Sequence, residues 1–511
     1  MTADAHETRP ASAARRRGGE LAAWLIAAGL ATATTAWLAT PRADMMFLDA
    51  DSLATALISS SLHAGHVQHW AMSPVLFLPE AALFHLLSFL GAGVRGTLIL
   101  SAIANLLLMY GAIRVLAGSS QRHPHAARGA LAAFTVLCAL AALEGPGSRF
   151  FMWASLNVLT TYYVATIVAT IMVVGLVRRY VEEVRAGADP RGIPPLIAAI
   201  TLLSLLTNPI FAGWCLAPLG IMILVVCGRE RRLPWRLLIW IGAGAASGLV
   251  VRAVVSHWFV MAVGQDYVRV DQVAGATAFY ARAAAALPRE PFGLLWIAVV
   301  VTIGAAVVAA GVSAWRRRDA GGAIVAGTAL LSGPLMLAVA IATGSEALRY
   351  LQPLVVFPIA ALVLVAGRAW PASLPRAAVA GMVAACVGLG IVATPSLVRA
   401  AQVTDADIAC VGAWIDESGQ SGVGDFWTVR PVKAYLADPS PLIQITDDFI
   451  VWPWVMNRSD YLDAEATFVL LDEKSPEFRY PPGFEPETAE AISCGRYTIL
   501  DYGERVIPLE S

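Results

Sequence analysis

The chain has 511 residues, of which 58% are hydrophobic and only 14% are charged, and its formal net charge is -1. Soluble domains carry about 25% charged residues, so this composition excludes an ordinary soluble enzyme and indicates an integral membrane protein. The near-zero net charge gives no electrostatic reason to expect a nucleic-acid partner.

Apolar blocks long enough to cross a bilayer recur along the first 398 residues. A spanning helix needs roughly 20 consecutive apolar residues. The clear candidates are 21–40, 96–116, 155–177, 211–227, 237–256, 293–314, 323–343, 351–366 and 377–394, and the shorter blocks 129–143 and 193–207 are apolar throughout. Together they predict an all-α bundle of about 11 transmembrane helices over residues 21–398, preceded by a basic segment at 1–20.

Arginine placement predicts the orientation of this bundle, because cytoplasmic loops carry the excess of basic residues. The main clusters are 15–17, 178–191, 229–236 and 316–318. Placing them all in the cytoplasm puts the N-terminus inside and the C-terminus outside. This works only if the apolar block 74–93 lies within one long outer loop, residues 41–95. The alternative, 12 spans with the C-terminus inside, places arginine clusters on the outer face.

The composition changes after about residue 398. Residues 399–511 are polar, acidic and rich in turns. Their pattern predicts helices at 405–417 and 431–437 and strands at 442–446, 467–471 and 497–501. We therefore expect a small α/β domain on the outer face. Cys410 and Cys494 bracket this domain, and an oxidising compartment would permit a disulfide between them, although spacing alone leaves the pairing open.

Two carboxylates follow the first span, in the stretch Asp44-Met-Met-Phe-Leu-Asp49-Ala-Asp51-Ser52. Paired carboxylates at a membrane surface can act as a base on a hydroxyl group or bind a divalent cation. Asp49 and Asp51 are therefore the catalytic candidates, and the metal-binding candidates if a metal is used. The alternative is a solvated loop in which Asp51 or Ser52 caps a helix.

Further polar groups fall on the same predicted outer side. Arg349 and Arg252 lie beside predicted spans and are candidates for binding a lipid-linked phosphate, because the planar fork of an arginine matches phosphate oxygens. The alternatives are a headgroup anchor for Arg349 and, for Arg252, an ion pair with a carboxylate of an outer loop. Glu80 has two interpretations. It faces a cavity, as an ionisable group at membrane depth usually does, or its side chain lies at the membrane interface. The remaining cavity candidates are His66, His69, Arg149, Asn208, Tyr350 and Gln352.

This arrangement resembles the glycosyltransferase C (GT-C) superfamily of polytopic membrane enzymes. The resemblance rests on the acidic pair after the first span and on Ser73-Pro-Val-Leu-Phe-Leu-Pro79-Glu80 in the long outer loop. It also rests on Arg349-Tyr-Leu-Gln-Pro353 before a late span, and on the closing α/β domain. The stretch Leu206-Thr-Asn208-Pro209 is similar to a Ser-Asp-Pro stretch of such proteins, with Asn in place of Asp.

The resemblance implies a hexosyl- or pentosyltransferase that uses a polyprenyl-phosphate sugar as donor. Asp49 or Asp51 would be the base or hold Mg²⁺ or Mn²⁺, while Arg349, helped by Arg252, would neutralise the departing lipid phosphate. The acceptor would be a periplasmic glycan, lipid or protein, and the chain would sit among the lipids of a bacterial inner membrane with its C-terminal domain in the periplasm. The competing hypotheses are a transporter or flippase of envelope lipids and a non-catalytic assembly protein.

Overall fold

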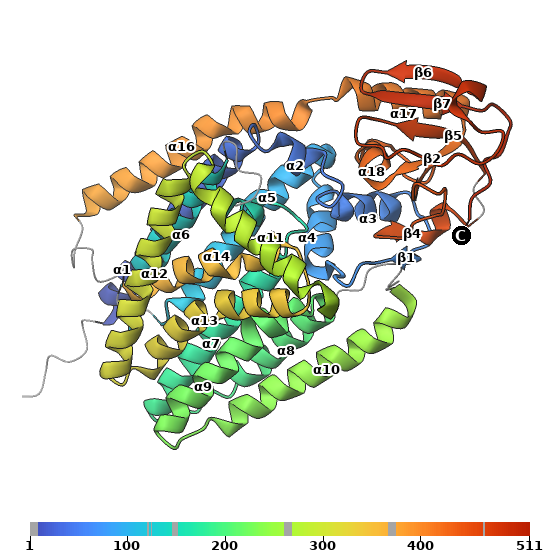
Figure 1. Ribbon diagram of the computed structural model, residues 1–511. Coiled ribbons are helices and arrows are strands. Elements are labelled where there is room, and N and C mark those ends of the chain that lie inside the picture. Colours follow the sequence, from blue (N-terminus) through green and yellow to red (C-terminus); the bar gives the residue numbers. More distant parts are fainter. Residues whose placement is uncertain are drawn as a thin grey trace, which may run out of the picture.

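The computed structural model describes residues 9–119, 122–123, 125–145, 152–259, 268–365, 375–462 and 465–510 (Figure 1). Within these ranges, nine helical segments are long and apolar enough to cross a membrane. They are α1 (Arg9–Leu38), α5 (Gly93–Leu116), α6 (Ala126–Glu144), α7 (Val164–Arg185), the π-helical turn with α9 (Ala212–Arg229), α10 (Trp235–Phe259), α12 (Gly293–Arg316), α13 (Ala320–Ala342) and α16 (Arg376–Gln402).

Two shorter apolar helical segments complete the bundle: α8 (Ile193–Thr207) and the run Leu348–Leu364, which contains α14 (Pro353–Ala361). Both coincide with predicted blocks, so the expected all-helical, multi-pass membrane architecture is confirmed. Helix α16 packs along α1, where a side chain on Gly29 would place its Cβ 2.1 Å from the carbonyl oxygen of Cys386. A glycine is therefore required for this close approach.

The predicted span 155–177 is wrong at its beginning. Helix α7 starts at Val164, and Ser155–Val158 forms a 3₁₀ turn instead. The carboxylate of Glu144 accepts hydrogen bonds from the backbone N–H groups of Ala154 (2.9 Å) and Ser155 (2.7 Å). Because these polar groups are satisfied outside a regular helix, the apolar composition of the run does not force a helix there.

The predicted outer loop, residues 41–95, contains α2 (Ala43–Phe47), α3 (Ala54–His63), β1 (Trp70–Ala71) and α4 (Leu78–Ser88). Helix α4 has 11 residues, so it is about 16 Å long at a rise of 1.5 Å per residue, and the hydrocarbon core of a bilayer is about 30 Å thick. The block 74–93 therefore does not form a spanning helix.

The C-terminal domain contains α17 (Ala406–Ser418), β2 (Ser421–Asp425), α18 (Phe426–Tyr435), β3 (Leu442–Ile445), β4 (Met456–Asn457), β5 (Ala466–Leu471), β6 (Glu490–Cys494) and β7 (Tyr497–Asp501). Five strands form a sheet in the order β3-β2-β5-β7-β6, parallel on the β3 side and antiparallel on the β6 side. The predicted α/β class is confirmed. Cys410 on α17 and Cys494 on β6 form a disulfide.

Sequence patterns miss parts of this domain. Strand β2 reads Ser-Gly-Val-Gly-Asp, which is poor in strand-forming residues. A side chain on Gly422 would place its Cβ 2.3 Å from the Phe468 ring, so packing excludes larger residues there. The helix predicted at 431–437 begins earlier, at Phe426, because the Asp425 side chain accepts a hydrogen bond from the N–H of Trp427 (2.9 Å) and caps it.

The C-terminal domain is attached to the long outer loop as well as to α16 (Figure 1). Strand β1 pairs antiparallel with β4, with Trp70 opposite Asn457. The Asn457 side chain also donates a hydrogen bond to the hydroxyl of Ser61 on α3 (3.0 Å). These contacts place the domain against the loop that carries Asp49 and Asp51.

Candidate active site

The acidic pair lies in the short turn between α2 and α3. Asp49 Oδ1 accepts hydrogen bonds from the Ser52 N–H (3.0 Å), the Ser52 hydroxyl (3.2 Å) and the Tyr162 hydroxyl (3.2 Å). Asp51 Oδ2 lies 3.1 Å from Nη1 of Arg349. The structure thus brings three of the predicted site residues together, across almost 300 positions of sequence.

The arginine is held by the segment that precedes α14. Its guanidinium lies 6.0 Å from the centroid of the Tyr163 ring, at the outer limit of a cation–π contact. The buried side chain of Gln352 donates to the backbone carbonyls of Tyr162 and Arg349, at 3.1 Å each. Tyr350 accepts a hydrogen bond on its carbonyl from the Trp214 indole (3.1 Å). The Arg-Tyr-Leu-Gln segment is therefore oriented through its backbone.

The third segment of the site, residues 160–163, was not predicted from sequence because it falls inside a block interpreted as a span. The hydroxyl of Thr160 donates to the carbonyl of Ser52 (2.7 Å), and that of Thr161 donates to the carbonyl of Asp51 (2.8 Å). Tyr163 has a left-handed φ of 66°, a costly conformation for a residue with a side chain. The run Thr-Thr-Tyr-Tyr at the start of an apolar block is the only sequence signal for it.

The electrostatics of the pair favour a carboxyl group that accepts a proton readily. Loss of hydration and the neighbouring charge of Asp51 raise the pKa of Asp49, while hydrogen bonds from Ser52 and Tyr162 oppose that rise. A raised pKa makes the Asp49 carboxylate a better base than an exposed aspartate.

Arg430 of the C-terminal domain is a second residue that sequence reasoning missed. Its side chain is 1% exposed; Nε donates to the carbonyl of Ala50 (3.0 Å), and Nη1 donates to that of Val455 (2.7 Å). Burial lowers its pKa to about 10, so the side chain stays protonated at neutral pH. Arg430 thereby places a positive charge against the backbone between the two aspartates. A lone arginine in a polar domain carries no sequence signal for such a role.

Glu80 and Asn208 lie against the beginning of α7. Glu80 Oε1 accepts a hydrogen bond from the Ala165 N–H (3.3 Å), and burial raises its pKa to about 7. Asn208 donates to the hydroxyl of Thr166 (3.2 Å). Both side chains are buried. They support the turn at Tyr163 through α7.

His66 and His69, the two histidines predicted to line the substrate cavity, lie at the boundary between the outer loop and the C-terminal domain. His66 Nε2 is 3.4 Å from Asp438 Oδ1. The backbone N–H of His69 donates to Asn457 Oδ1 (3.0 Å), and its carbonyl accepts from the Arg458 N–H (2.9 Å). In the described contacts the histidines therefore join two parts of the chain and do not reach the acidic pair.

Arg252 also lies apart from the pair. Its terminal nitrogens donate to the backbone carbonyls of Leu206 (2.8 Å) and Pro74, which ties the outer loop to the end of α8. Within the described part of the chain, no contact joins Arg252 to Asp49, Asp51 or Arg349, so the expected help from Arg252 has no geometric support. Arg149 lies outside the described residues.

Metal binding has limited support. Among the residues that the structure describes, no group of three or more His, Cys, Asp or Glu side chains is placed to hold a metal ion. Asp49 and Asp51 are two oxygen donors, and one of them already contacts Arg349. The arginine can itself neutralise negative charge at this position.

No protein-family model matches the sequence, and no curated protein sequence matches it. Solved structures do. ArnT from Cupriavidus metallidurans bound to undecaprenyl phosphate matches with a TM-score of 0.53 at 14% identity, over 94% of this chain and 98% of that one. ArnT in the apo state matches with the same score and identity over 93% and 97%.

An oligosaccharyltransferase from Archaeoglobus fulgidus in the apo form is more distant, with a TM-score of 0.47 and 11% identity. It covers 89% of this chain and 69% of that one. The ArnT matches run over nearly the whole length of both chains, so the likeness includes the helix bundle and the C-terminal domain together. The chain therefore has the GT-C fold, as its sequence motifs predict.

Proposed function

We propose that this protein is a membrane glycosyltransferase that moves a sugar from a polyprenyl-phosphate donor to an acceptor on the outer face of the membrane. The observation that carries the proposal is the contact between Asp51 and Arg349, 3.1 Å apart, beside Asp49 and within a GT-C fold. A base next to a fixed cation is what sugar transfer from a lipid phosphate needs, because a proton leaves the acceptor while negative charge grows on the departing phosphate.

In the proposed reaction Asp49 is the general base. Its carboxylate takes the proton of an acceptor hydroxyl group as that oxygen bonds to the anomeric carbon of the sugar. The bond between the anomeric carbon and the phosphate oxygen breaks, and the lipid phosphate leaves with the electron pair. Arg349 neutralises this charge, and Asp51 orients the guanidinium through its ion pair.

Two unpaired polar atoms support a ligand at this position. Arg349 Nε and Gln352 Oε1 are buried, and neither has a hydrogen-bond partner among the described residues. Leaving a buried donor or acceptor unsatisfied is costly. A donor phosphate could accept a hydrogen bond from Nε, and a sugar hydroxyl could donate one to Oε1.

The comparison with ArnT supports the class of donor, since the matched ArnT structure holds undecaprenyl phosphate. The C-terminal domain, attached beside the pair through Arg430, is in a position to bind the acceptor. The predicted orientation implies a periplasmic acceptor, which would be a cell-envelope glycan, lipid or protein. A divalent cation, Mg²⁺ or Mn²⁺, at the two aspartates remains an expectation of the family resemblance.

The test is a transfer assay with the purified full-length protein. A panel of radiolabelled polyprenyl-phosphate sugars is mixed with envelope extract as acceptor, with and without EDTA. The site variant is Asp49→Ala/Asp51→Ala. The control with the same loss of two carboxylates is Asp447→Ala/Asp448→Ala in the C-terminal domain, where both side chains pair with Arg479. We expect the site variant to lose transfer about 100-fold or more, in line with the loss of a general base.

The other outcomes are equally informative. If no donor is consumed by the unmodified protein, the proposal is wrong and a transport or non-catalytic role is favoured. If the site variant transfers label as well as the control variant does, the enzyme class stands and the assignment of Asp49 and Asp51 is wrong. Equal membrane expression of both variants separates these results from misfolding.

A further inference from the structure

A pocket lined with arginines lies at the opposite end of the bundle from Asp49. It is formed where α9 ends, where α12 ends and where α13 begins, and its volume is about 340 Å³. The site residue Arg349 follows the other end of α13, a 23-residue helix about 34 Å long at 1.5 Å per residue. The pocket and the acidic pair are thus separated by roughly the thickness of a bilayer core.

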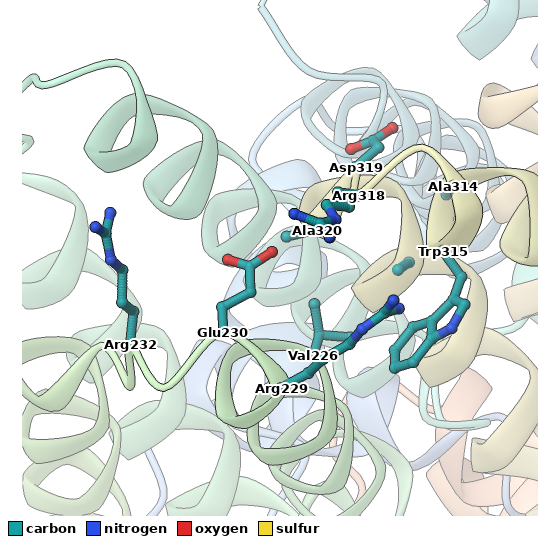
Figure 2. Close-up of a pocket in the computed structure, with 10 residues that line it drawn as sticks. Val226, Arg229, Glu230, Arg232, Ala314, Trp315, Arg318, Asp319 and Ala320 are labelled. Atoms are coloured by element: carbon teal, nitrogen blue, oxygen red, sulfur yellow. The ribbon is translucent and has the colours of Figure 1, made fainter.

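Positive charge dominates this pocket. Arg229, Arg232 and Arg318 line it together with Glu230 and Asp319 (Figure 2). Both carboxylates have partners elsewhere. Glu230 pairs with Arg185, which lies outside the lining (2.5 Å), and Asp319 caps α13 by accepting the Gly322 N–H (2.9 Å).

The lining therefore holds three arginines against two carboxylates, and one of these carboxylates is already paired with Arg185. No ion pair is found for the side chains of the three lining arginines within the described ranges. Figure 2 shows Arg232 on one side of Glu230, and Arg229 and Arg318 on the other. Guanidinium groups arranged around one hollow match the oxygens of a phosphate group.

One of the arginines is already oriented. The guanidinium carbon of Arg229 lies 4.4 Å from the centroid of the Trp315 ring (Figure 2). Cation–π stacking of this kind holds the arginine plane while leaving its N–H groups free to donate. A ligand at this position would not need to order the Arg229 side chain, so part of the entropic cost of binding is already met.

The location indicates a lipid ligand. Trp315 is 37% exposed at the end of a spanning helix, which is typical of the membrane–water interface. The pocket floor contains Val226, Ala314 and Ala323. Helices α9 and α12 expose apolar side chains along their length that acyl chains can cover: Ile221, Leu224, Val225, Val308 and Val312.

We propose that this pocket, termed the arginine pocket, binds the phosphate headgroup of an anionic glycerophospholipid. Basic pockets between transmembrane helices are the usual environment for such headgroups. Its volume lies at the lower end of the ~300–1,000 Å³ range of small-molecule sites, in agreement with a headgroup that enters the pocket while its chains stay outside. The inference does not depend on the proposed transferase activity.

The test measures lipid binding to the purified full-length protein by native mass spectrometry and by thermal unfolding in nanodiscs. The discs contain phosphatidylcholine alone or with phosphatidylglycerol, and a third arm adds inorganic phosphate. The pocket variant is Arg229→Gln/Arg232→Gln. Its matched control is Arg231→Gln/Arg316→Gln, which removes two exposed arginines outside the pocket lining, one next to Arg232 and one at the end of α12.

We expect the unmodified protein and the control variant to retain phosphatidylglycerol, and the pocket variant to bind it about tenfold more weakly or worse, because charge-assisted hydrogen bonds are lost. Equal binding by the pocket and control variants would overturn the proposal. Inorganic phosphate that displaces the lipid at millimolar concentration would also overturn it, in favour of a soluble phosphate ligand. If the double variant fails to fold, the single variant Arg232→Gln replaces it in the same binding measurement, because the exposed Arg232 side chain can be changed without disturbing the fold.

Discussion

The two ends of the helix bundle use charge in opposite ways. At the end that carries Asp49 and Asp51, the charged side chains of Arg349 and Arg430 are each fixed by a distant part of the chain, and the C-terminal domain lies beside them. At the end of the arginine pocket, the arginines sit at helix ends and are mostly exposed. A charge that is fixed by an ion pair or by buried hydrogen bonds can be positioned for chemistry. An exposed charge without an ion-pair partner suits membrane topology or reversible binding.

Removing one arginine from each end of the bundle is expected to give the largest difference. Arg349→Ala should lower kcat/KM of the transferase about 10²–10³-fold, as expected for loss of one group that stabilises developing negative charge. Arg232→Ala, in the arginine pocket, should leave transfer within about twofold. The measurement is steady-state transfer with varied donor. Equal losses in the two variants would mean that net charge, and not the position of Arg349, matters.

The end of the bundle that carries Asp49 and Asp51 should also depend on the stability of the C-terminal domain. The disulfide between Cys410 and Cys494 closes a long loop, so Cys410→Ser/Cys494→Ser should lower the free energy of unfolding of this domain by about 2–5 kcal/mol. Differential scanning calorimetry with and without reductant measures it. A reductant should destabilise the unmodified protein and leave the double variant unchanged; an effect on both would point to another target.

A smaller effect is expected at the link between the domain and the acidic turn. Arg430→Gln removes the hydrogen bonds to the carbonyls of Ala50 and Val455 and should lower the free energy of unfolding by about 1–3 kcal/mol. Transfer should fall as well, and Arg430→Lys should restore part of it. Arg316→Gln at the other end is the matched control. Loss of stability with full transfer in folded Arg430→Gln protein would limit Arg430 to a structural role.

The smallest expected effect is a shift in pH dependence. Because the pKa of Asp49 is raised, the acidic limb of kcat/KM should lie above the ordinary aspartate value of about 4, and activity should fall as the pH falls through that limb and the base becomes protonated. Tyr162→Phe removes a hydrogen bond that lowers this pKa. It should move the limb up by about 0.5–1 pH unit.

The matched control for that shift is Tyr180→Phe, a buried tyrosine further along α7. Its profile should coincide with that of the unmodified protein. A limb that stays in place in Tyr162→Phe would indicate that Asp49 is not the base, and would direct attention to Asp51.

Much of the architecture could be predicted from the chain alone. Long apolar runs indicate spanning helices, because a segment inside the hydrocarbon core must form all its backbone hydrogen bonds internally and expose apolar side chains. The same logic failed at residues 155–163, where the apolar run is buried but hydrogen-bonded to Glu144 and to the turn of Asp51. The pattern of strand-forming residues likewise missed β2, where the Phe468 ring requires a glycine at position 422.

The amino-acid sequence was enough to predict the membrane class of this protein, the non-spanning block at 74–93 and the α/β class of the last domain, and it made Asp49, Asp51 and Arg349 candidates for the site. These predictions depend on local composition and on the order of motifs. The contact of Arg349 with Asp51, the contact of Arg430 with the same turn and the separate position of Arg252 are visible only in the folded chain. Such contacts join residues hundreds of positions apart, and their geometry depends on packing that no local pattern encodes.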